Sequence, residues 1–303
     1  MSARSIVVAT VVAWSALLGA GAALGQDAGT PTPDATTAPS PPDKSGFTVF
    51  NPTPTADLRA LCTDRPSKSA SPCTVDAGHF QVESDVFNFT ADTSGGATTN
   101  TYLLSNPTLK LGLTNTLDVE LSITPYEVIT VRDHATDARS RAEGIGDLFA
   151  KVKWNLLGDD GGNIGLAISP YIKIPTANGQ IGNRAVEGGL VGLTSFTLPK
   201  GWSLNLDPEV DVLRDATDGS RHINLQAPLS LNHAVSKEVT ATLELWADAN
   251  FDPVGTITQA SFDLGLAWIP TKIPTFQLDG GVNFGLDRST PAAQLYIGAS
   301  KRF

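Results

Sequence analysis

Two stretches with regular alternation of apolar and polar residues, 147–156 and 164–174, constrain the fold more than any other feature of the sequence. A period of two places successive side chains on opposite faces of a β-strand. The segment between them, 158–163, is rich in Gly and Asp, which favours a tight turn. One face of each strand is aliphatic, whereas the other carries polar residues that include Lys151 and Lys153. A membrane wall with lipid on one side and a wet lumen on the other has this pattern.

The same alternation recurs from residue 78 to the C-terminus and predicts an all-β fold, a single-chain antiparallel transmembrane β-barrel of about twelve strands. The connections are alternately short and longer, which is typical of outer-membrane barrels with their short turns on the periplasmic side. Prolines within several strands predict local bulges or gaps. The predicted strands are 78–90, 101–113, 117–129, 144–157, 164–176, 186–198, 202–214, 221–233, 238–251, 258–269, 275–287 and 292–303.

Composition excludes several classes of protein. The formal net charge of −10 argues against a nucleic-acid partner, since no basic stripe exists to neutralise phosphates. A mean hydropathy near zero argues against a bundle of membrane-spanning helices, but it is compatible with a barrel in which every second residue is polar. We therefore expect outer-membrane lipid to be the main contact of this chain, and the bacterial outer membrane to be its location.

The N-terminal quarter has a different composition. Residues 1–25 have a basic start, an apolar run and a small-x-small sequence before Gln26, which indicates a secretory signal peptide. Residues 26–45 are rich in Pro, Thr and Ala and predict a disordered tether. Residues 46–77 predict a periplasmic segment, and 78–303 the barrel itself.

The segment 46–77 contains the only two cysteines, Cys62 and Cys73. Two cysteines at this spacing in an exported chain predict a disulfide. A metal site is the alternative, but His79 is the only nearby histidine. The disulfide would close a loop in front of the first strand, and we expect this loop to reach into the periplasmic mouth as a partial plug.

Aromatic residues support the barrel. Trp154, Trp202 and Trp268 all lie on the aliphatic face next to short turns, as expected of an interfacial girdle. The last strand ends at Phe303 and is similar to the C-terminal strand by which the outer-membrane assembly machinery recognises barrels, although Lys301 replaces a more usual apolar residue. That machinery is therefore an expected partner.

Four short sequences suggest a family: Thr63-Asp-Arg-Pro66, Gly78-His-Phe-Gln-Val-Glu83, Gly144-Ile-Gly-Asp147 and Tyr296-Ile-Gly-Ala299. With them, the chain from about residue 60 to its end resembles the outer-membrane transporter-like proteins of the MetA-pathway of phenol degradation family. The resemblance implies an outer-membrane β-barrel that acts as a channel for small aromatic or hydrophobic compounds. It assigns no cofactor and no functional residue.

The predicted inner face is net acidic. Asp207, Glu209 and Asp211 follow one strand, whereas Lys151, Lys153 and Lys173 follow two others, so opposed walls of charge would orient polar solutes and set ion selectivity. The alternative is that these residues form salt bridges that only stabilise a narrow barrel. Two further acids, Asp118 and Glu120, and three aromatic residues, Tyr171, Trp246 and Tyr296, are also predicted to face the lumen.

Two other functions were weighed against a channel for small solutes. A structural or adhesive barrel would act through its tether, 26–45. An outer-membrane hydrolase would use Ser220 and His222 with Asp215 or Asp218, but no catalytic motif surrounds them. The remaining histidines have no metal-ligand spacing. The sequence therefore predicts no catalytic, cofactor or metal site.

Overall fold

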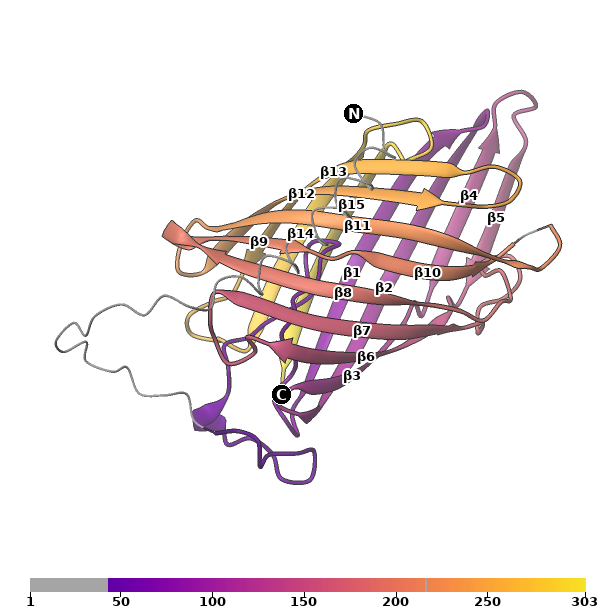
Figure 1. Cartoon of the computed structure of the whole chain (residues 1–303). Coiled ribbons are helices and arrows are strands. Elements are labelled where there is room, and N and C mark those ends of the chain that lie inside the picture. The colour runs from indigo at the N-terminus through magenta and orange to yellow at the C-terminus, as the bar shows by residue number, and fades with distance from the viewer. Residues whose placement is uncertain (1–42, 216) are drawn as a thin grey trace, which may run out of the picture.

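The computed structural model describes residues 43–215 and 217–303, and the strands form a closed antiparallel barrel (Figure 1). Closure is complete because the first strand, β1, pairs with both β2 and the last strand, β15. The strands are β1 (Phe80–Ser94), β2 (Ala97–Thr114), β3 (Leu117–Ile123), β4 (Glu127–Asp133), β5 (Arg139–Gly144), β6 (Leu148–Leu157), β7 (Ile164–Ile174), β8 (Glu187–Leu198), β9 (Trp202–Leu206), β10 (Glu209–Arg214), β11 (Arg221–Ala234), β12 (Val239–Asn250), β13 (Ile257–Trp268), β14 (Phe276–Gly285) and β15 (Ala293–Arg302).

These fifteen segments occupy twelve positions in the wall, so the predicted twelve-stranded barrel is confirmed. Three of the predicted strands are each broken in two, giving the pairs β3 and β4, β5 and β6, and β9 and β10. Pro125 and Pro208 lie in two of the breaks, where a residue without a backbone N–H cannot continue the ladder. Pro107, Pro170 and Pro228 remain inside paired strands.

Two predicted loops on the long-loop rim are wrong. The polar stretch 91–100 continues the strands β1 and β2 as far as a turn at Gly95 and Gly96, whose φ angles are positive. The stretch 130–143 is also largely strand, because β4 and β5 form a hairpin that pairs with the wall through β2 alone. Both stretches are polar, which is typical of loops, but Thr93, Thr98 and Thr99 in the first favour a strand, and residues of both stretches extend the hairpins.

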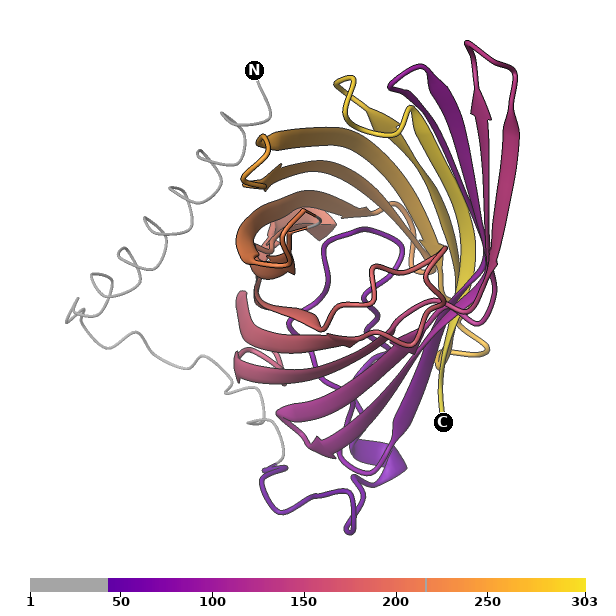
Figure 2. The same cartoon turned by 90° about the vertical axis from the view of Figure 1, so that its right-hand side faces the viewer.

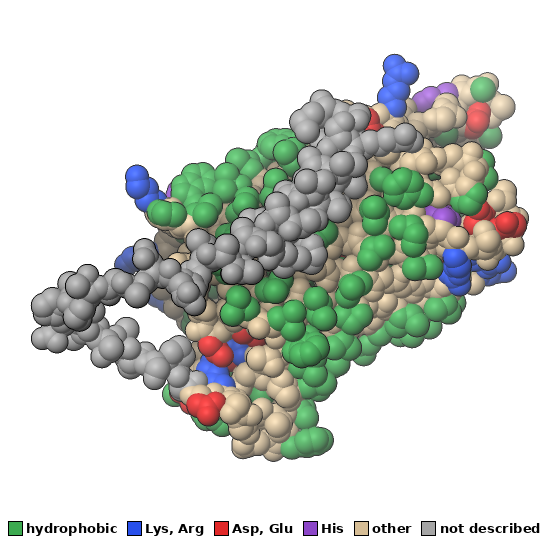
Figure 3. Space-filling view, viewed as in Figure 1, with side chains coloured by type: hydrophobic (Ala, Val, Ile, Leu, Met, Phe, Trp, Pro, Cys, Tyr) green, Lys and Arg blue, Asp and Glu red, His purple; other side chains and the backbone are tan. Residues whose placement is uncertain are grey.

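The two faces of the wall differ as the alternation requires. Along β12, Leu243 and Leu245 are about 45% and 42% exposed, whereas Glu244 between them is 1% exposed. Apolar side chains cover the outer wall and charged side chains gather towards its ends (Figure 3). Trp154 and Trp268 lie exposed on this outer wall, as the girdle prediction requires, whereas Trp202 is half-buried and stacks on His233 with ring centres 4.2 Å apart.

The N-terminal part of the described chain runs into the barrel. Figure 2, a view along the barrel, shows the indigo trace that precedes β1 inside the ring of strands. The predicted signal peptide, 1–25, and most of the predicted tether, 26–45, lie outside the described residues. Within residues 43–215 and 217–303, no helix is both long and apolar enough to cross a membrane.

Substitutions at two exposed leucines test the position of the wall in the membrane. Leu121→Arg, near the middle of the wall on β3, should lower the free energy of unfolding in lipid by ~2–4 kcal/mol, because it places a charge in hydrocarbon. The matched change Leu157→Arg, next to a short turn, should cost only ~0–1 kcal/mol. Denaturant titration in lipid vesicles measures both values, and equal costs would contradict this position of the wall in the membrane.

Candidate functional site in the barrel lumen

The inner wall carries many buried carboxylates. All but Asp207, which lies in the break between β9 and β10, are on strands whose neighbouring residues point outwards, so the alternation that makes the outer wall apolar also brings the acids together inside. A buried carboxylate is costly unless it is paired or hydrogen-bonded. The buried acids on the wall are Glu83, Asp85, Asp118, Glu120, Asp207, Asp211, Glu244, Asp248, Asp263 and Asp279.

Much of the pairing comes from the loop 62–73, which the Cys62–Cys73 disulfide closes as predicted. Asp64 in this loop accepts hydrogen bonds from Lys153 Nζ at 2.8 Å and from Lys110 Nζ. The same two lysines lie beside wall acids, with Lys110 2.5 Å from Glu83. The loop therefore inserts one carboxylate between two buried ammonium groups.

The next residues of the loop supply positive charge. Arg65 pairs with Asp85 at 2.6 Å and with Asp279 at 2.7 Å, and so links β1 to β14. Lys68 pairs with Asp263 on β13. Because these partners lie on separate strands, the loop is held from several sides of the lumen.

Backbone N–H groups of the loop complete the set. Lys68 and Ser69 donate to the two oxygens of Glu244, each at 2.9 Å, and Ala70 donates to Asp207 at 2.7 Å. A carboxylate that accepts two successive N–H groups fixes the local path of the chain. The inner wall thus recognises the backbone of the loop as well as its side chains.

A second cluster holds the segment at the short-turn rim. Arg59 contacts Asp76, Asp159 and Asp160 within 3.3 Å, and Lys44 donates to Asp160 at 2.8 Å. Burial alone would raise the pKa of Asp160, but the hydrogen bond from Lys44 and the charge of Arg59 keep that pKa below its ordinary value. Because this pKa is lowered, the stabilisation it contributes is lost as the pH falls.

The structure places the predicted lumen charges inside the barrel and pairs most of them. Lys153 lies 3.2 Å from Glu120, and Lys173 lies 2.6 Å from Glu187.

The predicted lumen acids accept hydrogen bonds. Asp118 accepts the N–H of Val75 at 3.0 Å. Asp207 accepts the loop's N–H, as described above, and Asp211 accepts the Tyr171 hydroxyl at 2.7 Å. Lys151 and Glu209 line a cavity of about 90 Å³.

The predicted lumen aromatics also lie inside and contact cations. Lys68 Nζ lies 5.2 Å from the ring centre of Trp246, and Arg65 lies 5.9 Å from that of Tyr296. Lys151 Nζ lies 6.0 Å from that of Tyr171. Cation–π contacts therefore join the loop to two of the three rings.

Three cavities meet at the loop. One of about 420 Å³ lies towards the short-turn rim and is lined by Arg65, Ser67 and Ser69. One of about 300 Å³ lies on the other side, next to Lys68 and Trp246. The cavity of about 90 Å³ is a narrow space that shares Lys68 and Trp246 with the second cavity. The loop therefore separates two chambers of the lumen, with a narrow space beside it.

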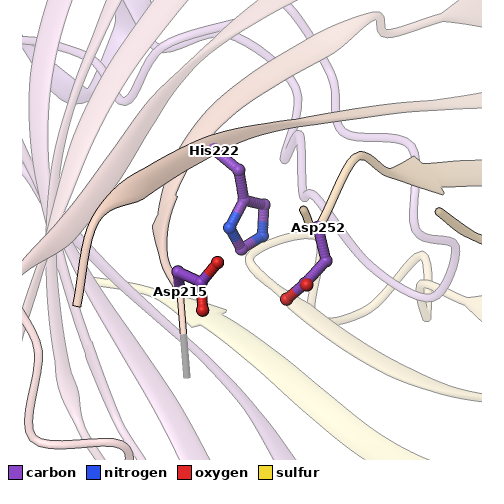
Figure 4. A group of neighbouring side chains, drawn as sticks. All are labelled: Asp215, His222 and Asp252. Carbon is purple, nitrogen blue, oxygen red and sulfur yellow. The ribbon is translucent and has the colours of Figure 1, made fainter. Parts of the chain in front are cut away.

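The histidine of the proposed hydrolase site lies at the opposite rim, at the start of β11. Figure 4 shows His222 between Asp215 and Asp252. The backbone N–H of Ser220 donates to Asp218 at 2.8 Å, and no hydrogen bond from Ser220 to His222 occurs among the described residues. Sequence reasoning missed Asp252, because it lies in a different loop thirty residues further along the chain.

Comparison with known proteins finds one matching family and solved outer-membrane proteins of similar fold. A family model described as "Putative MetA-pathway of phenol degradation" matches residues 63–303. The COG4313 outer membrane channel from Pseudomonas putida F1 is similar in fold, with a TM-score of 0.56 and 14% identity over 83% of this chain and 99% of that one. The NanC porin gives a TM-score of 0.47 and 10% identity over 73% of this chain and 98% of that one. A search of curated protein sequences gives no match.

Removal of one charge tests how the loop is held. Asp64→Asn removes the only loop carboxylate that pairs with Lys110 and Lys153 among the described residues and should favour release of the loop by ~3 kcal/mol, the lower end for breaking a buried pair. Trypsin cleavage after Lys68 should then be about a hundred times faster, since every ~1.4 kcal/mol is a tenfold change in the population of the open form.

Asp57→Asn is the matched control, because Asp57 precedes the loop and forms no salt bridge among the described residues. Its cleavage rate should equal that of the wild type. Equal rates in all three proteins would show that Asp64 does not hold the loop.

Proposed function

The chain belongs to the MetA-pathway of phenol degradation family, and we propose that it is an outer-membrane channel for small solutes in which residues 62–73 form the constriction. Its closed twelve-stranded barrel places it in the bacterial outer membrane. The observation that carries the proposal is the pair of lumen cavities, about 420 and 300 Å³, on either side of the loop. A barrel with only a structural role has no need of two chambers of this size.

The surroundings of the constriction suggest which solutes pass. Trp246 lines the 300 Å³ cavity and the narrow space, so an aromatic ring that enters from that chamber meets an indole first. Aromatic pairs are attractive beyond the area they bury. The polar, net acidic wall then supplies hydrogen-bond acceptors. Small aromatic or hydrophobic compounds with a polar group therefore match this route best.

The other functions have less support. The adhesive barrel depends on the tether 26–45, of which only residues 43–45 are described. The hydrolase lacks contact between its proposed nucleophile, Ser220, and His222 among the described residues. Recognition by the assembly machinery through the last strand is a proposal that accompanies the channel. Phe303 is 56% exposed at the end of this strand and stacks on Phe80, with ring centres 4.7 Å apart.

Ion selectivity tests the channel. On the strands, the acids predicted to face inwards outnumber the bases. Residues 59–76 add three bases, Arg59, Arg65 and Lys68, and two acids, Asp64 and Asp76, so the lumen remains net acidic. We expect single-channel currents that prefer cations. The preference should weaken with salt, since the Debye length falls from about 10 Å at 0.1 M to about 3 Å at 1 M.

Two neutral substitutions next to the narrow cavity localise the effect. Glu209→Gln should reduce the preference for cations, and Lys151→Gln should increase it, because both side chains line that cavity. Reversal potentials in a planar bilayer under a salt gradient measure both changes. Absence of single-channel steps from the refolded protein would contradict the channel, and unchanged reversal potentials would show that these two residues do not set selectivity.

A further inference from the structure

Three residues meet on the inner face of the long-loop rim because of the strand register. Asn224 pairs with Asn250 in the β11–β12 ladder. His222 and Asp252 lie two residues further towards the rim, on the same face and opposite each other. In the β10–β11 ladder, Leu213 pairs with His222, and Asp215 follows Leu213 by two residues on the same face. Three successive segments of the wall thus place a carboxylate on each side of one imidazole (Figure 4).

The donor atoms are close and the histidine has no other partner. One ligand atom from each of Asp215, His222 and Asp252 lies within 4.8 Å of the others. His222 is half-buried as a residue, but its side chain is buried. Both of its ring nitrogens lack exposed surface and lack a hydrogen-bond partner among residues 43–215 and 217–303. A buried polar side chain without a partner is costly, which points to a ligand between these residues.

The two carboxylates are held in place by their own loops. Asp215 Oδ1 accepts the backbone N–H of Thr217 at 2.7 Å, and Asp252 Oδ1 accepts that of Val254 at 2.8 Å. The second oxygen of each carboxylate, Oδ2, accepts no hydrogen bond from the described residues. One lone pair from each loop is therefore available to a cation that also binds the imidazole.

We propose that Asp215, His222 and Asp252 bind a divalent transition-metal ion such as Zn²⁺ at the extracellular mouth of the channel. Imidazole with carboxylates suits zinc, whereas Mg²⁺ and Ca²⁺ prefer oxygen ligands alone. Ligand atoms on one tetrahedral zinc ion lie roughly 3.3 Å apart, given zinc–ligand distances of about 2.0–2.1 Å. The three donors lie within 4.8 Å of one another, so they need to approach by ~1.5 Å at most, which a small shift of the two loops provides.

The position suggests what the ion does. The loop 215–220 joins β10 to β11, and the loop 251–256 joins β12 to β13. A shared ion would tie both loops to the start of β11. Just inside the mouth, Asn224 bridges Asp211 and Asp248 at 3.2 and 2.8 Å, so the bound ion would stand at the entrance to the acidic lumen. This inference does not depend on which solute the channel carries.

Calorimetric titration of the detergent-refolded protein with Zn²⁺ tests the site. The protein is used without a histidine tag, because tag histidines bind zinc. We expect one equivalent to bind, with the affinity lowered at least tenfold in His222→Ala and in Asp252→Asn. His134→Ala, a histidine in the turn between β4 and β5, is the matched control and should bind as the wild type does. Anomalous migration on unheated gels shows that each variant still forms the barrel.

Three results would overturn the proposal. The first is no zinc binding by the folded wild type. The second is equal binding by His222→Ala, which would place the zinc at other residues. The third is displacement of Zn²⁺ by equimolar Ca²⁺ or Mg²⁺, which would show an acidic surface without a transition-metal preference.

Discussion

The structure depends on the cost of leaving a carboxylate unpaired inside a narrow barrel. Lipid on the outer face drives most polar residues of the strands inwards, and twelve strands enclose only a moderately wide interior. Acids such as Glu244 and Asp207 are therefore buried almost completely. Removing the partner of a buried charge costs ~3–5 kcal/mol, so the lumen must contain donors for these groups. The chain supplies many of them itself, from the segment that precedes the first strand.

The disulfide lowers the entropy cost of placing these donors in the lumen. The loop between Cys62 and Cys73 carries Asp64, Arg65 and Lys68, and a closed loop loses less entropy when all its contacts form together. The loop is charged with both signs, so it pairs with the lysines as well as with the acids of the wall. The same contacts that stabilise the barrel also narrow it. Stabilisation of the lumen and restriction of passage are thus consequences of one set of ion pairs.

Local pattern in the sequence predicted the wall well, because alternation is set by lipid on one side and water on the other. The breaks at Pro125 and Pro208 also follow from local chemistry, and the disulfide from the presence of two cysteines. The extension of β1 and β2 through 91–100 was missed because a polar hairpin beyond the membrane has the composition of a loop. The partners of Asp64 were not predictable, since Lys110 and Lys153 lie far along the chain and nothing local marks the pairing. The approach of Asp252 to His222 was not predictable either. It depends on the register of two strand pairs, which no local pattern in the sequence sets.

The central claim is that wall carboxylates hold residues 62–73 inside the lumen, and hydrogen exchange tests it most directly. The backbone N–H groups of Lys68, Ser69 and Ala70 donate to Glu244 and Asp207. Mass spectrometry of the protein in lipid nanodiscs should therefore find the peptide that spans these residues protected to a degree comparable with the strands. Exchange of this peptide within seconds, as in an exposed loop, would contradict the account.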